Sequence, residues 1–265
     1  VAVYMLYRLY VQLFDLEQRW NVLIIVLMLI SMMIGAFGGL TEKTIRRVLG
    51  YQMLNGMPFI LVMLAFTSDD PRRALAAGIM YTIHHMLTVG SLILASGAIE
   101  ETYGTGLLTK LSGLARRDPI IAWIFAAGAF SVVGFPPFSG MWGKLMIVFE
   151  IARVGGAWAW IAIAAIIIAS FAAFLAMLRV WRKVFWGKGL PEDKVPDELV
   201  IRKKLMAPSA ALILGSLCMF IFSGIVLDVV DSASEQLLDT TAYTETVLGD
   251  EPIAVPNIDE IQEGR

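Results

Sequence analysis

The stretch that decides the fold is GFPPFSGMWGK, residues 134–144, because it interrupts one of the most apolar runs of the chain. Pro136 and Pro137 lack backbone donors, and a proline disfavours the helical conformation of the residue before it. Lys144 follows about two helical turns later. Irregular backbone and a cation are both costly in hydrocarbon unless they are buried in protein or line a hydrated cavity. We therefore predict a discontinuous helix near residues 134–140, made of two half-helices.

The sequence around this stretch is that of an integral membrane protein. Apolar residues make up 58% of the 265 residues and charged residues only 17%, with a mean hydropathy of +0.72, whereas about a quarter of the residues of soluble proteins are charged. After a partial helix at 1–14, runs long enough to cross roughly 30 Å of hydrocarbon lie at 20–40, 45–66, 74–99, 120–151, 157–186 and 205–230. We predict an all-α polytopic membrane protein, with a transmembrane bundle at 1–231 (the partial helix plus six spans) and an acidic extramembrane C-terminal tail at 232–265.

Several other classes of protein have no support in the sequence. The single cysteine, Cys218, cannot form an internal disulfide, and no metal-ligand pattern accompanies it, so we predict neither a metal site nor a cofactor. A net charge of −2, without a basic patch that contains aromatic residues, argues against nucleic acid as a partner. The opening VAVYMLYRLY is not a signal peptide; we interpret it as the second half of a helix already under way, in a fragment of a longer protein.

The distribution of positive charge predicts the orientation in the membrane. Of the 21 Lys and Arg residues, 14 lie in the connections after the first, third and fifth full spans and 6 on the opposite side, with Lys144 inside a span. By the positive-inside rule the first set is cytoplasmic. The C-terminal tail is then expected outside the cell.

Lys144 is the first polar feature at membrane depth. It is expected in the first turns of the second half-helix, near the positive end of that helix dipole. A lysine held there can bind and release a proton, a use that an ordinary solvated lysine cannot serve. The alternative is a lysine whose amine snorkels to the outer headgroups from a merely kinked helix.

The second feature is a pair of histidines in YTIHHMLTVGS, residues 81–91, in the middle of a span. Adjacent helical residues point about 100° apart, so the two rings cannot share a face. The ladder through His85 contains Tyr81 and Thr88, which favours His85 as a proton relay and leaves His84 secondary. Tyr81 and Thr88 also lie three and four residues from His84, so the preference is modest. A buried histidine that only packs against a neighbouring helix is the other interpretation.

The third feature is GYQMLNGMP, which places Gln52 and Asn55 three residues apart on one face. Together with Tyr81 and Thr88, these amides are candidates for the lining of a hydrated path. Polar side chains that join helices to each other are the commoner case in membranes.

Three blocks carry a resemblance to a known family: YTIHHMLTVGSLILASG, then LSGLARRDP, then GFPPFSGMWGK. Their order and spacing resemble the eleventh and twelfth helices of the antiporter-like family, which Mrp-type cation/proton antiporters share with the proton-pumping membrane subunits of respiratory complex I. The resemblance covers nearly the whole chain and implies an antiporter-like bundle, the second inverted repeat, from the end of helix 8 to helix 14. It implies that Lys144 is the ionisable residue after the break and His85 the histidine of the eleventh helix. The hinge would be formed by Gly134, Pro136, Pro137 and Gly140.

The same resemblance implies a function. Lys144, the doubled histidine and PPFSG favour the C-terminal half of a D-type chain of the Mrp antiporters, and hence a proton-translocating subunit of a heteromeric Na+/H+ antiporter in a prokaryotic plasma membrane. Its partners would be the other Mrp-type subunits, protons, Na+ and the lipid bilayer; it would not be an enzyme by itself. The family's glutamate and lysines in helices 5, 7 and 8 are not in this sequence, and Gly56 stands where complex I relatives often carry a histidine. The alternatives are a proton-pumping subunit of an NADH dehydrogenase or hydrogenase complex, and a non-conducting structural subunit.

Overall fold

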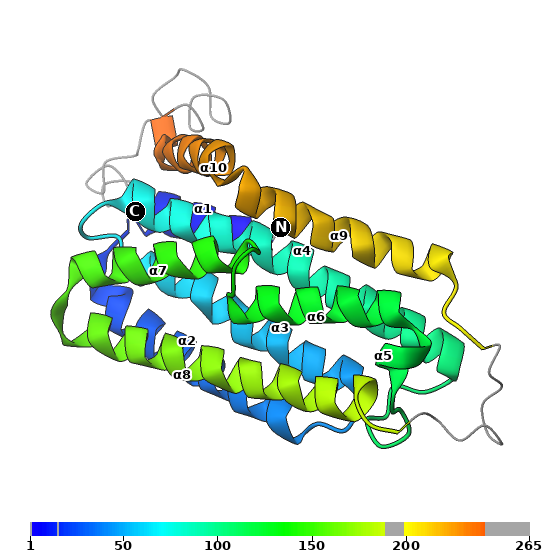
Figure 1. Ribbon diagram of the computed structural model, residues 1–265. Helices are drawn as coiled ribbons and strands as arrows, with labels where there is room; N and C mark the ends of the chain where they lie inside the picture. The colour runs from blue at the N-terminus through cyan, green and yellow to red at the C-terminus, as the bar shows by residue number, and fades with distance from the viewer. Residues whose placement is uncertain (1, 15, 189–198, 242–265) are drawn as a thin grey trace, which may run out of the picture.

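The structure, a computed structural model, describes residues 2–14, 16–188 and 199–241 (Figure 1). Its helices are α1 (Ala2–Leu13), α2 (Asn21–Thr41), α3 (Ile45–Leu61), α4 (Pro71–Tyr103), α5 (Leu114–Arg117), α6 (Pro119–Val133), α7 (Gly140–Val154), α8 (Gly156–Val180), α9 (Lys203–Ile221) and α10 (Ser223–Leu238). Short 3-10 turns at Gln18–Trp20 and Val62–Ala65 extend α2 and α3, and a π-helical turn at Trp181–Phe185 extends α8.

Helix α4 is the centre of the bundle. It packs against α3, α6, α7, α9 and α10, and its 33 residues span about 50 Å, more than the hydrocarbon layer needs. The Asp70 side chain accepts a hydrogen bond from the Arg73 backbone and Pro71 takes the first helical position, which together start the helix. The helix ends at Gly104, whose φ of +67° closes the last turn.

Membrane-length helices confirm the predicted class of fold. Among the described residues, five helices are long and apolar enough to cross a membrane, at Gln18–Thr41, Ile45–Ala65, Pro71–Tyr103, Gly156–Phe185 and Lys203–Ile221. The run at 120–151 is instead divided into α6 and α7, which follow one another along nearly the same direction (Figure 1). The discontinuous helix that the two prolines predict is therefore present.

The last predicted span, 205–230, is shorter than expected. Helix α9 ends at Ile221, the chain bends at Phe222, and α10 turns away to pack against α4. The reason is polarity, because Asp231 and Glu235 of α10 pair with Arg72 at the start of α4 and hold this segment at the end of the bundle. The position where we expected the tail to begin, residue 232, lies inside α10, whereas residues 242–265 lie outside the described residues.

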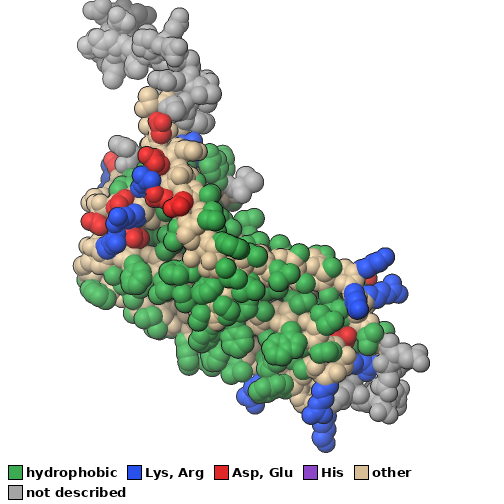
Figure 2. Space-filling model, turned by 45° about the horizontal axis from the view of Figure 1, so that its top comes forward, with side chains coloured by type: hydrophobic (Ala, Val, Ile, Leu, Met, Phe, Trp, Pro, Cys, Tyr) green, Lys and Arg blue, Asp and Glu red, His purple; other side chains and the backbone are tan. Residues whose placement is uncertain are grey.

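The surface of the bundle matches a membrane environment. In Figure 2, hydrophobic side chains cover the middle of the visible face, and charged side chains gather towards the ends. Inside, small residues let helices approach closely: a Cβ atom at Gly35 of α2 would lie 2.7 Å from the Asn55 Cα atom of α3. Such close contacts are typical of helix packing in membranes.

Candidate functional site

The break between α6 and α7 depends on glycines as well as prolines. Gly134 ends α6 with a φ of +101°, a conformation that L side chains rarely adopt, and the Pro136–Pro137 peptide bond in the link is cis. A Cβ atom at Gly140 would overlap the Ser131 carbonyl oxygen and lie 2.8 Å from His84 Cε1. The predicted hinge residues thus form the link, and Gly140 also allows the start of α7 to touch both α6 and α4.

Lys144 points back to the break. It is the fifth residue of α7, and its Nζ donates hydrogen bonds to the Val133 carbonyl oxygen at 2.8 Å and to Ser170 Oγ at 2.9 Å. Val133 is the last residue of α6, whose final carbonyls have no partner within the helix and carry its negative dipole end. From the sequence we expected only the dipole of α7 to act on this amine, but the amine also faces the opposite end of a second helix. Both acceptors belong to half-buried residues beside the break, whereas the amine of a snorkelling lysine would reach the headgroups.

An aromatic layer connects Lys144 to the histidines. Lys144 Nζ lies 5.4 Å from the centroid of the Phe59 ring, within range of a cation–π contact. Phe59 stacks on Tyr81 with ring centroids 5.1 Å apart, and Tyr81 stacks on His85 at 5.9 Å. The Tyr81 ring also lies 5.2 Å from the His84 ring. Tyr81 therefore contacts both histidines.

His84 bonds to a buried cluster of hydroxyl side chains. We define this hydroxyl cluster as Thr88, Ser131, Ser139 and Ser216. Its Nδ1 lies 2.9 Å from Ser139 Oγ and 3.3 Å from Thr88 Oγ1. Thr88 bonds Ser131 at 2.8 Å, and Ser216 joins Ser131 at 2.9 Å and Ser139 at 2.7 Å. His84 and the four residues of the hydroxyl cluster are each at most 1% exposed. The cluster links α4, α6, the break and α9.

His85 faces the other way, towards α3. A Cβ atom at Gly56 would overlap its ring, so the glycine of α3 provides the space that the imidazole fills. His85 is hydrogen-bonded to the Met53 backbone, but its Nε2 has no partner among the described residues. The same holds for both side-chain polar atoms of Gln52 and for Asn55 Oδ1, all of them buried. Buried polar atoms without partners are costly, and water is their usual partner. We call this side of α4 the amide side.

The predicted residues thus fall into two groups. Lys144 and the hinge residues are together at the break. His85 lies on the amide side, against Gly56, which is one turn of α3 away from Gln52. Thr88, which we placed on the ladder of His85, bonds His84 instead.

Sequence reasoning missed four serines. Ser170 bonds Lys144, and Ser131, Ser139 and Ser216 form most of the hydroxyl cluster. Each is an isolated hydroxyl in or beside an apolar run. Isolation of that kind is a weak signal, because serine is common wherever membrane helices pack closely.

Comparisons with known proteins agree on one family. Residues 1–174 match the family described as NADH:quinone oxidoreductase/Mrp antiporter, TM. The D chain of the Na(+)/H(+) antiporter of Bacillus subtilis (strain 168) is 30% identical over 94% of this chain and 49% of its own length. NADH-quinone oxidoreductase subunit N of Cupriavidus taiwanensis is 26% identical over 76% of this chain and 42% of its own length. This chain spans about half the length of these curated relatives.

A solved structure resembles most of this chain. It is the structure of the Mrp complex from Dietzia sp. DQ12-45-1b, in which one chain matches with a TM-score of 0.86 and 30% sequence identity. The match covers 94% of this chain and 53% of that one.

Proposed function

The chain belongs to the NADH:quinone oxidoreductase/Mrp antiporter transmembrane family, and on that premise we propose that it translocates protons as part of a heteromeric monovalent cation/proton antiporter. The cation we propose is Na+, and the partners are other Mrp-type antiporter subunits. The relatives named above include a chain of an Na(+)/H(+) antiporter, which supports this proposal. We place the protein in a prokaryotic plasma membrane with the C-terminal tail outside.

The observation that carries the proposal is the environment of the Lys144 amine. A protonated amine donates to both Val133 O and Ser170 Oγ, which lie 2.8 and 2.9 Å away. A neutral amine can still donate to the Val133 carbonyl, while its lone pair accepts from the Ser170 hydroxyl, because a hydroxyl is both donor and acceptor. Both protonation states therefore have partners in the same geometry. A site that must gain and lose a proton at each turnover needs this property.

The rest of the proposed proton path runs along α4. We propose His85 as the relay to Lys144, because its ring lies at Gly56 on the amide side, where buried polar atoms of Gln52 and Asn55 also lack partners among the described residues. The ring also stacks on Tyr81, which stacks on Phe59, the ring beside the amine. His84 has a secondary role at the hydroxyl cluster. Tyr81, Gln52 and Asn55 line the path, with water as the intervening carrier, whereas Thr88, which we had predicted to line it, lies with His84 in the hydroxyl cluster.

A second candidate function is proton pumping in a redox complex. The family includes subunits of NADH:quinone oxidoreductase, and one relative is such a subunit. In that case the redox centres would lie in other chains, and flavin or iron–sulfur subunits would co-purify with this one. A non-conducting structural subunit is the third possibility, which the following experiment excludes or supports.

Substitution of Lys144 tests the proposal. Sodium-dependent pH changes are measured in vesicles that contain equal amounts of assembled complex with Lys, Arg, Ala or Glu at this position. We expect Lys144→Arg to be nearly as inactive as Lys144→Ala, because a guanidinium keeps its proton at any workable pH. Lys144→Glu retains part of the activity, since a carboxylic acid can also exchange a proton there. Full activity of the Arg variant would contradict proton exchange at Lys144, and normal transport by the Ala variant would favour a structural subunit.

A further inference from the structure

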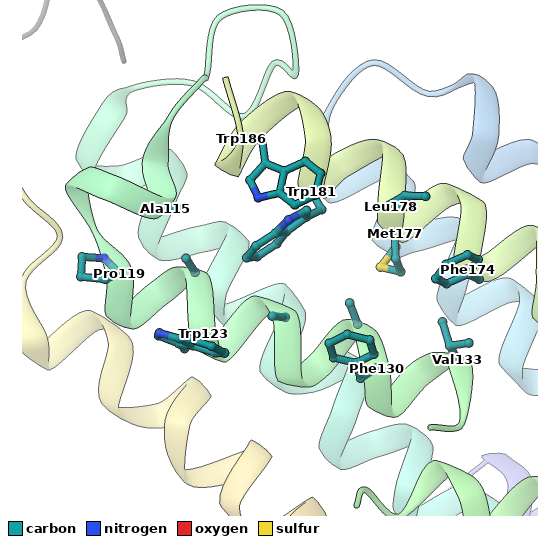
Figure 3. A pocket seen from close by; sticks show the side chains of 13 residues that line it. Ala115, Pro119, Trp123, Phe130, Val133, Phe174, Met177, Leu178, Trp181 and Trp186 are labelled. Atoms are coloured by element: carbon teal, nitrogen blue, oxygen red, sulfur yellow. The ribbon is translucent and has the colours of Figure 1, made fainter. Parts of the chain in front are cut away.

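A groove runs between α6 and α8 on the outside of the bundle (Figure 3). It has a volume of about 520 Å³, and nearly all of its wall is apolar. Ala115, Pro119 and Trp186 lie at one end, and Phe130, Val133 and Phe174 at the other. The second end reaches the break, since Val133 is the residue whose carbonyl accepts the Lys144 hydrogen bond.

The length of the groove is that of one leaflet. The 15 residues of α6 span about 22 Å. Half of a bilayer, with its headgroup region, measures roughly 20–22 Å. Because α6 begins at one end of the bundle and ends at the break, the groove extends from the level of the headgroups to the middle of the membrane.

The width of the groove suits a hydrocarbon chain and not a helix. A helix about 10–12 Å in diameter and as long as α6 would fill on the order of 1,700 Å³ or more. The groove offers about a third of that volume. A single extended chain of methylene groups would contact both walls along its whole length and gain the dispersion energy that an empty groove lacks.

The end of the groove at Ala115, Pro119 and Trp186, which we call the Trp186 end, carries the features of a headgroup site. Trp181 and Trp186 meet there edge to face, with ring centroids 6.3 Å apart, and indole rings prefer the interface between membrane and water. Four exposed basic residues lie within two positions of lining residues in the sequence: Arg116, Arg182, Lys183 and Lys188. Residues 181–188 contain no acidic side chain. This end is also the Lys- and Arg-rich side of the protein, where anionic lipids attract basic segments.

From these observations we propose that the groove binds one acyl chain of an anionic phospholipid. The phosphate lies among the basic residues at the Trp186 end, and the tip of the chain packs against Phe130, Val133 and Phe174. The lipid covers the outer side of the break and keeps water on the inner side, where Lys144 lies. Its binding does not depend on which ion the protein transports.

Photolabelling of the assembled complex tests the proposal. The complex is reconstituted into phosphatidylcholine vesicles that contain a small fraction of phosphatidylglycerol with a diazirine at the end of one acyl chain. After irradiation, mass spectrometry should find the adducts on the peptides that contain Phe130, Val133 and Phe174. The matching photoreactive phosphatidylcholine should label these peptides at least fivefold less. Equal labelling by the two lipids would overturn the assignment of an anionic headgroup.

Two sets of variants locate the site. Ala126→Trp places an indole in the groove and should reduce labelling at least fivefold, whereas Ala164→Trp, at an exposed position of α8 outside the groove, should leave it unchanged. The double variant Arg182→Gln, Lys183→Gln changes only exposed side chains and should abolish the preference for phosphatidylglycerol. If the Ala126 variant does not assemble, the charge variant alone decides. Full labelling of the Ala126 variant, or an unchanged preference in the charge variant, would refute the proposal. So would a lack of labelling of these peptides in the assembled complex, because a partner would then cover the groove.

Discussion

His84 and His85 are neighbours in sequence and lie at the same depth of α4, yet their surroundings are opposite. His84 faces α9 and the break, where Ser139 and Thr88 hold its Nδ1. His85 faces α3, where Gly56 makes room for the ring and the Nε2 atom has no partner among the described residues. The Nε2 atom of His84 is likewise buried without a partner among the described residues, so the two rings differ in what holds them: hydroxyl side chains bond His84, and the Met53 backbone bonds His85. Helices α3 and α9, and not α4 itself, therefore distinguish the two residues.

The largest effect is expected from removing one histidine at a time. His85→Ala should slow proton transfer by about 10²-fold, the lower end of the range of about 10²–10⁴-fold that a positioned proton-transfer group contributes, and His84→Ala should slow it only a few-fold. Proton uptake into everted vesicles, normalised to the amount of assembled complex, measures both. Equal or reversed effects would mean that the relay lies on the side of the hydroxyl cluster.

A smaller effect is expected from filling the space beside His85. Gly56→Ala places a methyl group where the imidazole lies, so the ring must shift, and such overpacking costs about 1–3 kcal/mol. We expect transport to fall several-fold. Gly50→Ala in the same helix is the matched control, because its Cβ would meet nothing within 4 Å and alanine favours a helix by about 1 kcal/mol. Thermal unfolding of the purified complex and vesicle transport are measured together. Wild-type transport in Gly56→Ala would show that the position of His85 does not matter.

The smallest effect is expected in the hydroxyl cluster. Ser216→Ala removes hydrogen bonds to Ser131 and Ser139, each of which keeps other partners, so the loss of stability should be about 1 kcal/mol. Transport should stay within about twofold if His84 is secondary. Ser232→Ala, at an exposed position of α10, controls for the loss of a hydroxyl. A loss of transport as large as that of His85→Ala, without a loss of stability, would show that the cluster itself conducts.

Much of the fold could be predicted from local features of the sequence. Apolar runs located the spans because a backbone in lipid has few alternatives to a helix, and two prolines located the break. The end of the last span was not predictable in this way. Apolar residues continue past Phe222, and the bend depends on the pairing of Asp231 with Arg72, 159 residues away in sequence.

The candidate site was predictable only in part. Lys144 is where the sequence indicated, but its acceptors come from α6 and α8, and no spacing rule within α7 identifies them. Thr88 is within reach of both histidines by helical geometry. Ser131 of α6 decides between them, since it bonds Thr88 on the side of His84. Which neighbour a side chain meets is a property of packing between helices.

The hydrogen bond from Lys144 to Val133 joins residues 11 apart across the link, so it is a mechanical tie between α6 and α7. An ammonium group offers three donors and a full positive charge, whereas a neutral amine offers two donors and no charge. Loss of the proton therefore loosens the tie, and by reciprocity a force that bends α7 away from α6 changes how firmly the amine holds its proton. A neighbouring subunit that pulls on either half-helix would regulate proton exchange without touching the lysine.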